Sequence, residues 1–467
     1  MSDPRSHPAQ APGIDTAAVR ALETTVVGPT DKGWPPALWG RTVAEVRGAG
    51  LTISAFPTPL VTLSRQALDT NLAAMAVWAA RHGLALAPHG KTTMAPQLWQ
   101  EQLEAGAWGI TVANLAQLAV ARAYGVTRVV LANALISPLG LRWLATDLAA
   151  HPEVRVLTWA DSTAVVEVMA AALAGGPADG GHPVDVLVEL GGVGGRTGAR
   201  TVGAALEVAR AVVAAPGLRL AGVTGYEGAL AHAAGAESLA AVRRYLKDLA
   251  GLQRRVADAG LYAALPGAVR PLVSAGGSAY PDLVAEVLGP LGTAASTAKG
   301  TTGTTGTRGA VTVLLRSGAY LTHDDGFYRD VSPLGRSPRT DGTPLRAALH
   351  GWVRVSSTPE PGLLIVDGGK RDLPYDEGLP KVQLVRSRTT GDPATPLTGY
   401  TLTALNDQHG FVRFDPGATG CTLAVGDELR LGVSHPCTTF DKWQLIPVVD
   451  DADAADPVVI DAVRTFF

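Results

Sequence analysis

One lysine stands directly behind an apolar segment that is typical of a strand. Residues 84–88, LALAP, are followed by His89, Gly90 and Lys91. A lysine at the end of a buried strand is partly desolvated, which lowers its pKa and makes it a usable nucleophile or base. The alternative is a solvated loop lysine. Taken alone, the segment favours that alternative because most lysines are surface charges.

Two glycine-rich turns follow other strand-like segments. Residues 191–198, GGVGGRTG, fit neither the Walker spacing nor GxGxxG, so we interpret them as a flexible turn that presents Arg196 to an anionic oxygen. Residues 274–278, SAGGS, precede a helix expected to begin near Pro281. Such a turn favours a phosphate, although a tight turn with a helix cap is the alternative. Tyr226, in GYEGALAH, is expected near the same strand ends, as a functional group or as a packed aromatic residue.

His435 and Cys437 stand two residues apart in the segment SHPC. On an extended segment, side chains at this spacing point to the same side, as two metal ligands must. A thiolate with an imidazole suits Zn²⁺ better than Mn²⁺ or Mg²⁺. Two protein ligands are too few for a structural zinc site, but they leave positions open for water or substrate, as in a catalytic site. On this spacing alone, a buried thiol beside a turn histidine is the more common arrangement.

The elements that would position these residues alternate between apolar strands and Ala-rich helices. We expect eight strands, over residues 84–88, 109–113, 128–132, 154–159, 184–190, 218–224, 271–275 and 311–315. This alternation indicates parallel strands covered by helices, and eight in succession indicate a closed (β/α)8 barrel. A doubly wound open sheet is the alternative. Barrel active sites lie at the carboxyl ends of the strands, which is where the lysine and both glycine-rich turns fall.

After Tyr320 the sequence consists of short alternating segments broken by Gly, Pro and Asp, which indicate an antiparallel β domain. The expected fold class is therefore α/β, with a (β/α)8 TIM-type barrel and a C-terminal antiparallel β domain. We assign residues 1–58 to an N-terminal extension that partly joins the β domain, 59–320 to the barrel and 321–467 to the β domain. The Gly/Thr-rich residues 290–309 are expected to form a mobile loop.

Composition and charge exclude several classes of protein. The chain has 467 residues, of which 46% are hydrophobic and 17% charged, as in a folded protein rather than a disordered one. Its net charge of -3 and lack of a Lys/Arg run exclude a nucleic-acid or membrane-surface partner. We find no apolar run of about 18 residues and no export signal, so we expect a cytoplasmic protein. Cys421 and Cys437 could pair, but in a reducing cytosol we expect free thiols.

Taken together, these segments resemble one known family. The motifs are PTPLVTLSRQALDTNL, APHGKTTMAP, ELGGVGGRTG, GYEGALAH, SAGGS, LRSGAYLTHDDGFY, DGGKRDLPYDEGLP, LNDQHGFVRF and SHPCTTFDKW. They are similar to those of the D-serine dehydratase/D-threonine aldolase group. These proteins are pyridoxal 5′-phosphate (PLP) enzymes of fold type III, and they are related to alanine racemase. The resemblance implies that residues before about Pro59, and a strand at residues 60–64, lie with or near the β domain.

The resemblance implies a role for each candidate residue. Lys91 matches the lysine that carries PLP as a Schiff base, and it is the candidate base for the α-proton of the substrate. Tyr226 is the second expected catalytic residue and would lie beside the cofactor. The other residues expected to bind PLP are His89, Arg196 near the phenolic oxygen, and the phosphate turn of Gly276, Gly277 and Ser278. His435 and Cys437 match the metal pair.

The implied activity is a PLP- and zinc-dependent dehydratase of the D-serine ammonia-lyase type. It would eliminate water from a D-3-hydroxy amino acid to give a 2-keto acid and ammonia. In D-threonine aldolases the second metal position tends to be Asp, binding a harder ion such as Mn²⁺, so Cys437 favours dehydration and zinc. The alternatives are retro-aldol cleavage of D-3-hydroxy amino acids and a non-catalytic PLP-binding protein. The resemblance also implies a homodimer.

Overall fold

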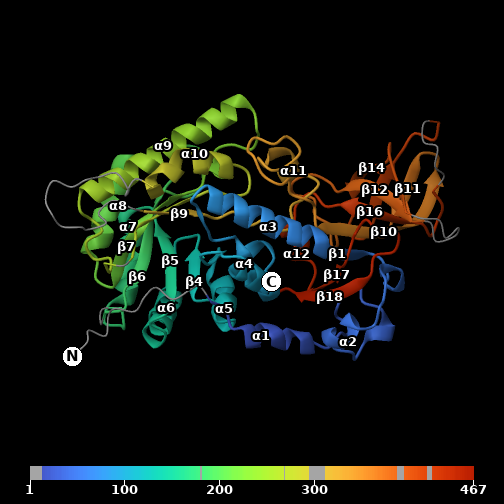
Figure 1. Ribbon diagram of the computed structural model, residues 1–467, viewed down its shortest axis with the longest axis horizontal. Coiled ribbons are helices and arrows are strands. Elements are labelled where there is room, and N and C mark those ends of the chain that lie inside the picture. Colours follow the sequence, from blue (N-terminus) through green and yellow to red (C-terminus); the bar gives the residue numbers. More distant parts are fainter. Residues whose placement is uncertain (1–12, 179–180, 268, 294–310, 387–393, 418–422) are drawn as a thin grey trace. The chain divides into compact units, whose positions relative to one another are not determined.

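The computed structural model describes residues 13–178, 181–267, 269–293, 311–386, 394–417 and 423–467 (Figure 1). The chain divides into two compact units. The first, here called the barrel unit, comprises Met1–Asp15, Ala76–Lys91 and Gln102–Gly318. The second, here called the β unit, comprises Thr16–Met75, Thr92–Glu101 and Ala319–Phe467.

Eight parallel strands form the sheet of the barrel unit, in the order β2-β9-β8-β7-β6-β5-β4-β3. They are β2 (Ala85–Leu86), β3 (Ile110–Val112), β4 (Arg128–Leu131), β5 (Arg155–Ala160), β6 (Val184–Leu190), β7 (Leu218–Gly225), β8 (Leu272–Ala275) and β9 (Thr312–Leu315). The two ends of this order also meet, because His89 and Thr111 form a parallel bridge and the Thr111 N–H donates to the Pro88 carbonyl at 2.8 Å. The sheet is therefore closed, and the predicted (β/α)8 barrel is confirmed.

The barrel strands are buried along most of their length, as parallel strands covered by helices must be. In β6, every residue of VDVLVEL is buried, including an aspartate and a glutamate. Buried residues from several strands form one core, which comprises Ala87, Val130, Leu157, Trp159, Leu187, Ala221, Leu272 and Leu314. These continuous apolar runs are the reason that the strands could be located from the sequence.

Helices follow the strands and pack against them (Figure 1). They are α5 (Leu115–Ala123), α6 (Pro138–Ala150), α7 (Thr163–Leu173), α8 (Val202–Ala214), α9 (Ala236–Asp258) and α10 (Pro281–Thr293). Four of them begin after a polar residue whose side chain accepts a backbone N–H of the first turn, namely Asn114, Ser137, Ser162 and Thr201. Such caps satisfy donors that have no partner within the helix, and they fix where each helix starts.

The loop expected at residues 290–309 begins later than predicted. Helix α10 continues to Thr293 with Pro290 inside it. The rest of the expected loop, residues 294–309, lies outside the described residues.

A second, mainly antiparallel sheet of ten strands forms the β unit. Its strands are β1 (Leu60–Ser64), β10 (Leu349–Glu360), β11 (Leu363–Val366), β12 (Lys381–Arg386), β13 (Thr395–Pro396), β14 (Thr401–Leu405), β15 (Gly410–Arg413), β16 (Glu428–Gly432), β17 (Leu445–Val449) and β18 (Val459–Arg464). Short helices α11 (Phe327–Val331) and α12 (Cys437–Phe440) lie between strands along the chain. The predicted C-terminal β domain is confirmed, and its last element is a strand.

Strand β1 belongs to this sheet, as the resemblance implied for residues 60–64, although the assigned barrel bounds, residues 59–320, included it. It pairs antiparallel with β10, where Leu60 lies opposite Trp352, and parallel with β17. The N-terminal helices α1 (Thr16–Arg20) and α2 (Val43–Arg47) also fall in the β unit. One core joins this N-terminal segment to the sheet, since Trp34 and Phe56 are buried with Trp352. The division between units falls within α3 (Arg65–Arg81) and α4 (Pro96–Glu104).

No helix within the described ranges combines the length and the apolar character needed to cross a membrane.

Candidate active site

Lys91 lies in a single 3-10 turn, Gly90–Thr92, that follows strand β2 through Pro88 and His89. The Lys91 side chain is half-buried. Burial, and then the positive charges of Lys91, Arg316 and Arg196, hold the pKa of His89 well below its ordinary value. The imidazole is therefore neutral at physiological pH, and its Nδ1 atom is buried without a hydrogen-bond partner among the described residues. The same interactions place Lys91 and Arg196 near His89 in the barrel unit.

Tyr226 follows strand β7 and contacts Arg196, whose guanidinium lies 4.9 Å from the centre of the Tyr226 ring. A second tyrosine fixes the backbone there, because the Tyr245 hydroxyl accepts the Tyr226 N–H at 3.1 Å and donates to the Leu190 carbonyl at 2.5 Å. Gly225 has no room for a side chain, since a Cβ atom would overlap that hydroxyl. The structure thus brings together Tyr226 and Arg196, two residues predicted from separate motifs.

The loop that carries Arg196 is organised by Arg200, which we did not single out from the sequence. Its guanidinium donates to the carbonyls of Thr197 and Gly198 at 2.8 Å each, and also to those of Gly195 and Arg196. The glycines let the chain fold around this cation, so that backbone carbonyls converge on one side chain. Its sequence position, four residues after Arg196, gives no sign of this role.

The SAGGS turn is held by a carboxylate that the sequence analysis also passed over. Glu227, fully buried, accepts the N–H groups of Gly276 at 2.9 Å and Gly277 at 3.1 Å. On the other side, the Ser317 hydroxyl donates to the Gly277 carbonyl at 2.6 Å. Ser278 is buried and lies three residues before the start of α10. Two of the N–H groups expected to meet a phosphate are thus paired with Glu227.

Arg316 is a buried cation at the end of strand β9. Only 1% of its surface is exposed, and it donates to Thr224, Ser274 and the Gly225 carbonyl, which lie on strands β7 and β8. Its Nε atom is buried without a partner among the described residues. Burial lowers the pKa of Arg316, but nearby Glu227 opposes the effect of burial. The sequence could have indicated Arg316 as a candidate site residue, because in LRSGAY it directly follows a barrel strand.

His435 and Cys437 lie together in the β unit, but not on an extended segment. Pro436 is in the helical region and begins the short helix α12, so a turn rather than strand alternation joins the pair. Burial lowers the pKa of His435, but interactions with Cys437 and Asp376 more than offset this and raise it to about 9. Cys437 is a free thiol, and its Sγ lies 3.4 Å from the Thr92 hydroxyl. Cys421 lies outside the described residues.

Asp376 orients the His435 ring. The sequence gives no indication of this contact. Asp376 Oδ2 lies 2.7 Å from His435 Nδ1, and its Oδ1 accepts the Thr438 hydroxyl at 2.6 Å. This leaves Nε2 as the ring nitrogen that can bind a metal, with a carboxylate behind it, as in many metal sites. No group of three or more His, Cys, Asp or Glu in the described part of the chain could hold a metal. A metal at this pair would therefore keep positions for water or substrate.

A buried carboxyl group lies close to this pair. Asp324 Oδ1 accepts the N–H groups of Gly326, Tyr328 and Arg329, and Oδ2 is buried without a partner within the described ranges. Burial raises the pKa of Asp324 to about 7, while the charge of His435 opposes the rise. The Tyr328 ring lies 6.5 Å from that of His435. The motif THDDGFY therefore contributes to the surroundings of His435 and Cys437.

Comparison with known proteins connects these features to a family. Residues 348–449 match the family described as "Putative serine dehydratase domain". Over 422 residues, the chain is 28% identical to a D-threonine aldolase from Arthrobacter sp., covering 90% of this chain and 94% of that protein. These similarities support the D-serine dehydratase/D-threonine aldolase family. A 3-hydroxy-D-aspartate aldolase from Paracoccus denitrificans is 27% identical over 398 residues, covering 84% of this chain and 89% of that protein.

Several solved structures share the fold of this chain. D-threonine aldolase from Filomicrobium marinum superposes with a TM-score of 0.70 at 23% identity, covering 89% of this chain and 97% of that one. D-threo-3-hydroxyaspartate dehydratase from Delftia sp. HT23 gives 0.64 at 22% identity, covering 89% and 99%. An alanine racemase-like protein from Idiomarina loihiensis gives 0.63 at 17% identity, covering 88% and 96%. The alanine-racemase-like fold is thereby confirmed.

The residues of this chain fit PLP and zinc, the two groups that the resemblance implies. For PLP, the barrel unit provides a half-buried lysine, several cations and the close-packed Gly277, where a Cβ atom would lie 3.1 Å from the Tyr226 ring. The buried Nδ1 of His89 has no hydrogen-bond partner within the described ranges, so it could serve a ligand. For zinc, His435 and Cys437 provide one nitrogen and one sulfur donor, which is the donor chemistry zinc prefers.

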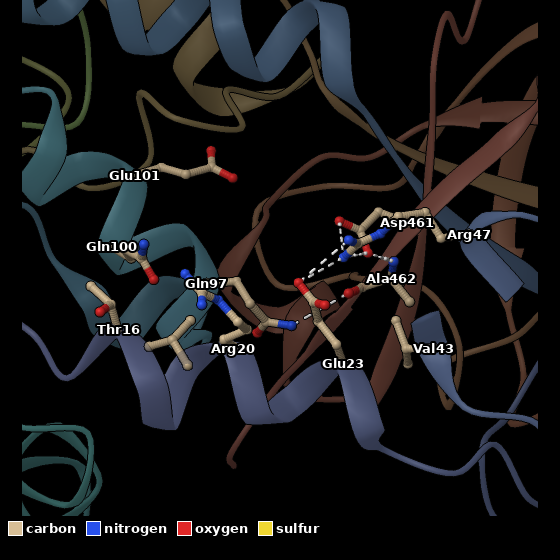
Figure 2. Close-up of a pocket in the computed structure, with 11 residues that line it drawn as sticks. Thr16, Arg20, Glu23, Val43, Arg47, Gln97, Gln100, Glu101, Asp461 and Ala462 are labelled. Atoms are coloured by element: carbon tan, nitrogen blue, oxygen red, sulfur yellow. Dashed lines mark hydrogen bonds and ion pairs between the residues drawn. The ribbon is translucent and has the colours of Figure 1, made fainter. Parts of the chain in front are cut away.

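A pocket of about 200 Å³ in the β unit is lined by none of these residues (Figure 2). Its walls come from α1, α2, α4 and β18, and they include Arg20, Arg47, Glu23 and Asp461. Arg47 pairs with Asp461 at 3.1 Å and Glu23 at 3.3 Å. Its charges largely satisfy one another, so we assign no ligand to this pocket.

Proposed function

We propose that this protein is a PLP- and zinc-dependent lyase that eliminates water from a D-3-hydroxy amino acid and yields a 2-keto acid and ammonia. The observation that carries the proposal is the His435–Cys437 pair, with its ring oriented by Asp376 at 2.7 Å, in a chain that also presents Lys91 behind a barrel strand. Relatives named for action on 3-hydroxy-D-amino acids support this class of substrate.

Lys91 would hold PLP and, once released by the substrate amine, would accept the α-proton. PLP, when bound, supplies an electron sink for the bond broken at Cα. His89 stays neutral because burial and neighbouring cations depress its pKa, so it can accept or donate a hydrogen bond without adding charge. Arg196, held over Tyr226, offers a fixed positive charge to an anionic oxygen of the cofactor or substrate.

His435 Nε2 and Cys437 Sγ would hold zinc, with Asp376 fixing the ring through Nδ1. Hydroxide is a poor leaving group, and a Lewis acid on the β-hydroxyl is the chemistry that zinc would supply there. The open positions of a two-ligand site suit this role better than a structural one.

Chelation tests the role of the metal. Purified enzyme is treated with EDTA, and turnover of a D-3-hydroxy amino acid is followed together with the visible absorbance of lysine-bound PLP. We expect turnover to be lost, the absorbance to stay, and added Zn²⁺ to restore turnover more fully than Mn²⁺ or Mg²⁺. Full activity of metal-free enzyme would contradict the proposal.

Retro-aldol cleavage of the same substrates is the second candidate. The observation that favours it is that the curated relatives with 28% and 27% identity are both named as aldolases. Cys437 favours dehydration, since the resemblance pairs Asp at this position with aldolases and a harder metal ion. Product identity separates the two reactions, because only cleavage of the Cα–Cβ bond releases an aldehyde.

A further inference from the structure

A buried glutamate occupies the turn that the sequence predicts to bind phosphate. Glu227 lies in a 3-10 turn directly after Tyr226, and its relative exposure is 0%. One carboxylate oxygen accepts the Gly276 N–H at 2.9 Å, and the other accepts the Gly277 N–H at 3.1 Å. Both oxygens are therefore used on two successive backbone donors of the turn.

This turn leaves little freedom for any other arrangement. Gly276 has a φ of +91°, which residues other than glycine rarely adopt, and a Cβ atom there would overlap Leu315. Gly277 packs against the Tyr226 ring, and its carbonyl accepts the Ser317 hydroxyl at 2.6 Å. The turn is thus clamped between Glu227, after β7, and Ser317, after β9.

Neighbouring groups stabilise the negative charge of Glu227. Burial raises the pKa of this carboxyl group, while the hydrogen bonds from the backbone and the nearby Arg316 lower it. Two N–H donors aimed at two oxygens suit the ionised form, because a protonated carboxyl group would have to donate from one of them. Arg316 lies buried in the same unit and provides the compensating positive charge.

We propose that Glu227 is a positioning residue for the phosphate of PLP. By pairing with Gly276 and Gly277, it fixes the path of the turn and thereby the position of Ser278, three residues before α10 begins at Pro281. The N–H groups of the two glycines are engaged by Glu227, so its role toward the phosphate is to shape the turn. This inference rests on the proposed function, because it requires PLP in the barrel unit.

The test is the dissociation constant of PLP in Glu227→Gln, measured by titrating resolved apoenzyme with PLP and following the absorbance of lysine-bound cofactor. A Gln side chain has one acceptor for two donors, so we expect PLP binding to weaken about ten- to hundredfold. At saturating PLP, the KM for the amino acid should stay within about twofold. The matched control is Glu286→Gln, an exposed glutamate on α10 that pairs with Arg243, which should bind PLP as the wild type does.

Hydrogen exchange gives a readout that does not depend on PLP. In the wild-type apoenzyme the amides of Gly276 and Gly277 should exchange slowly, and in Glu227→Gln they should exchange at least about tenfold faster. Ser317→Ala removes the hydrogen bond to the Gly277 carbonyl and should also weaken PLP binding. This variant replaces Glu227→Gln in the test if Glu227→Gln does not fold.

The outcomes distinguish a failure of the proposed PLP-dependent function from a failure of the proposed role of Glu227. Wild-type protein that binds no PLP would overturn the proposed function and this inference with it. Normal wild-type binding with unchanged affinity in both variants would overturn only the role of Glu227. Tighter PLP binding in Glu227→Gln would also overturn it, because the carboxylate would then be a competitor of the phosphate.

Discussion

At the scale of single residues, the reactive groups of this protein are controlled by neighbours distant in sequence. Asp376 lies 59 residues before the histidine that it orients, and Glu227 lies about 50 residues before the glycines that it binds. The residues that the sequence predicted, such as Lys91 and His435, have side chains whose chemistry is distinctive by type. Their supports are common acids and a common arginine, which tertiary contacts alone reveal.

Removing the carboxylate behind His435 should weaken metal binding. In Asp376→Asn the ring loses its charged partner at Nδ1, and we expect zinc affinity to fall about ten- to hundredfold while PLP remains bound. Competition with a chromophoric chelator measures the affinity. Asp248→Asn, an exposed position on α9, is the control and should bind zinc normally. Equal affinity in the two variants would exclude an orienting role for Asp376.

Lys91→Ala tests the residue that is central to the chemistry. Without the amine there is no covalent attachment and no base at this position, so turnover should fall by about a thousandfold or more. The visible absorbance of lysine-bound PLP should also disappear, while thermal unfolding of the apoprotein should change little because the side chain is only half-buried. A variant that keeps both absorbance and turnover would assign these roles to another lysine.

At the scale of elements, the sequence located the barrel strands because a strand buried on both faces is a continuous apolar run, as in β6. It located the glycine loops but not what shapes them. The loop at residues 191–198 owes its form to four carbonyl contacts of Arg200. The segment SHPC was expected to be extended, but Pro436 has helical backbone angles and precedes the helix α12, which the spacing of His435 and Cys437 does not predict.

Arg200→Ala should loosen the loop that presents Arg196. The loss of the hydrogen bonds to the loop carbonyls should raise KM or weaken PLP binding by about tenfold, with a smaller effect on stability because Arg200 is exposed. Steady-state kinetics at several PLP concentrations would measure this. Arg210→Ala, an exposed arginine on α8, is the matched control, and an equal effect in both variants would contradict the role of Arg200.

Strand β10 contains a histidine that should make the fold sensitive to acid. Burial, and then the charge of Arg430, lowers the pKa of His350 from 6.5 to about 3, with Asp453 opposing and Arg346 assisting. In the unfolded chain His350 binds a proton near pH 6.5, but in the folded chain it does not. The contribution of neutral His350 to the free energy of unfolding is therefore full above pH 6.5 and is lost as the pH falls towards 3. We expect His350 to account for about 2 kcal/mol of the loss between pH 7 and 4.5.

Urea unfolding of His350→Gln at the two pH values checks this expectation. The variant should be less stable than the wild type at pH 7, but its further loss at pH 4.5 should be smaller by about 2 kcal/mol. Parallel losses in the two proteins would show that His350 is not the acid-sensitive group.

At the scale of the whole molecule, the chain forms a barrel unit and a β unit that are interleaved in sequence. The order of elements predicted both folds, and the resemblance placed residues 60–64 with the β domain, but the local sequence alone could not reveal which strands β1 pairs with. Leu60 pairs with Trp352, almost 300 residues later, and an apolar strand of five residues suits either sheet equally well. Such long-range pairing is decided by the complete fold rather than by local sequence.

The most direct test of the account is the identity of the products formed from D-serine and D-threonine by purified enzyme with PLP and Zn²⁺. Keto acid, ammonia and aldehyde are measured in parallel, with the L-enantiomers as controls. We predict pyruvate and ammonia from D-serine, 2-oxobutanoate and ammonia from D-threonine, and no product from the L-amino acids. Glycine and acetaldehyde from D-threonine, without keto acid, would contradict dehydration and assign the protein to the aldolases. An enzyme that also consumes the L-enantiomers would contradict the assignment to D-amino acids.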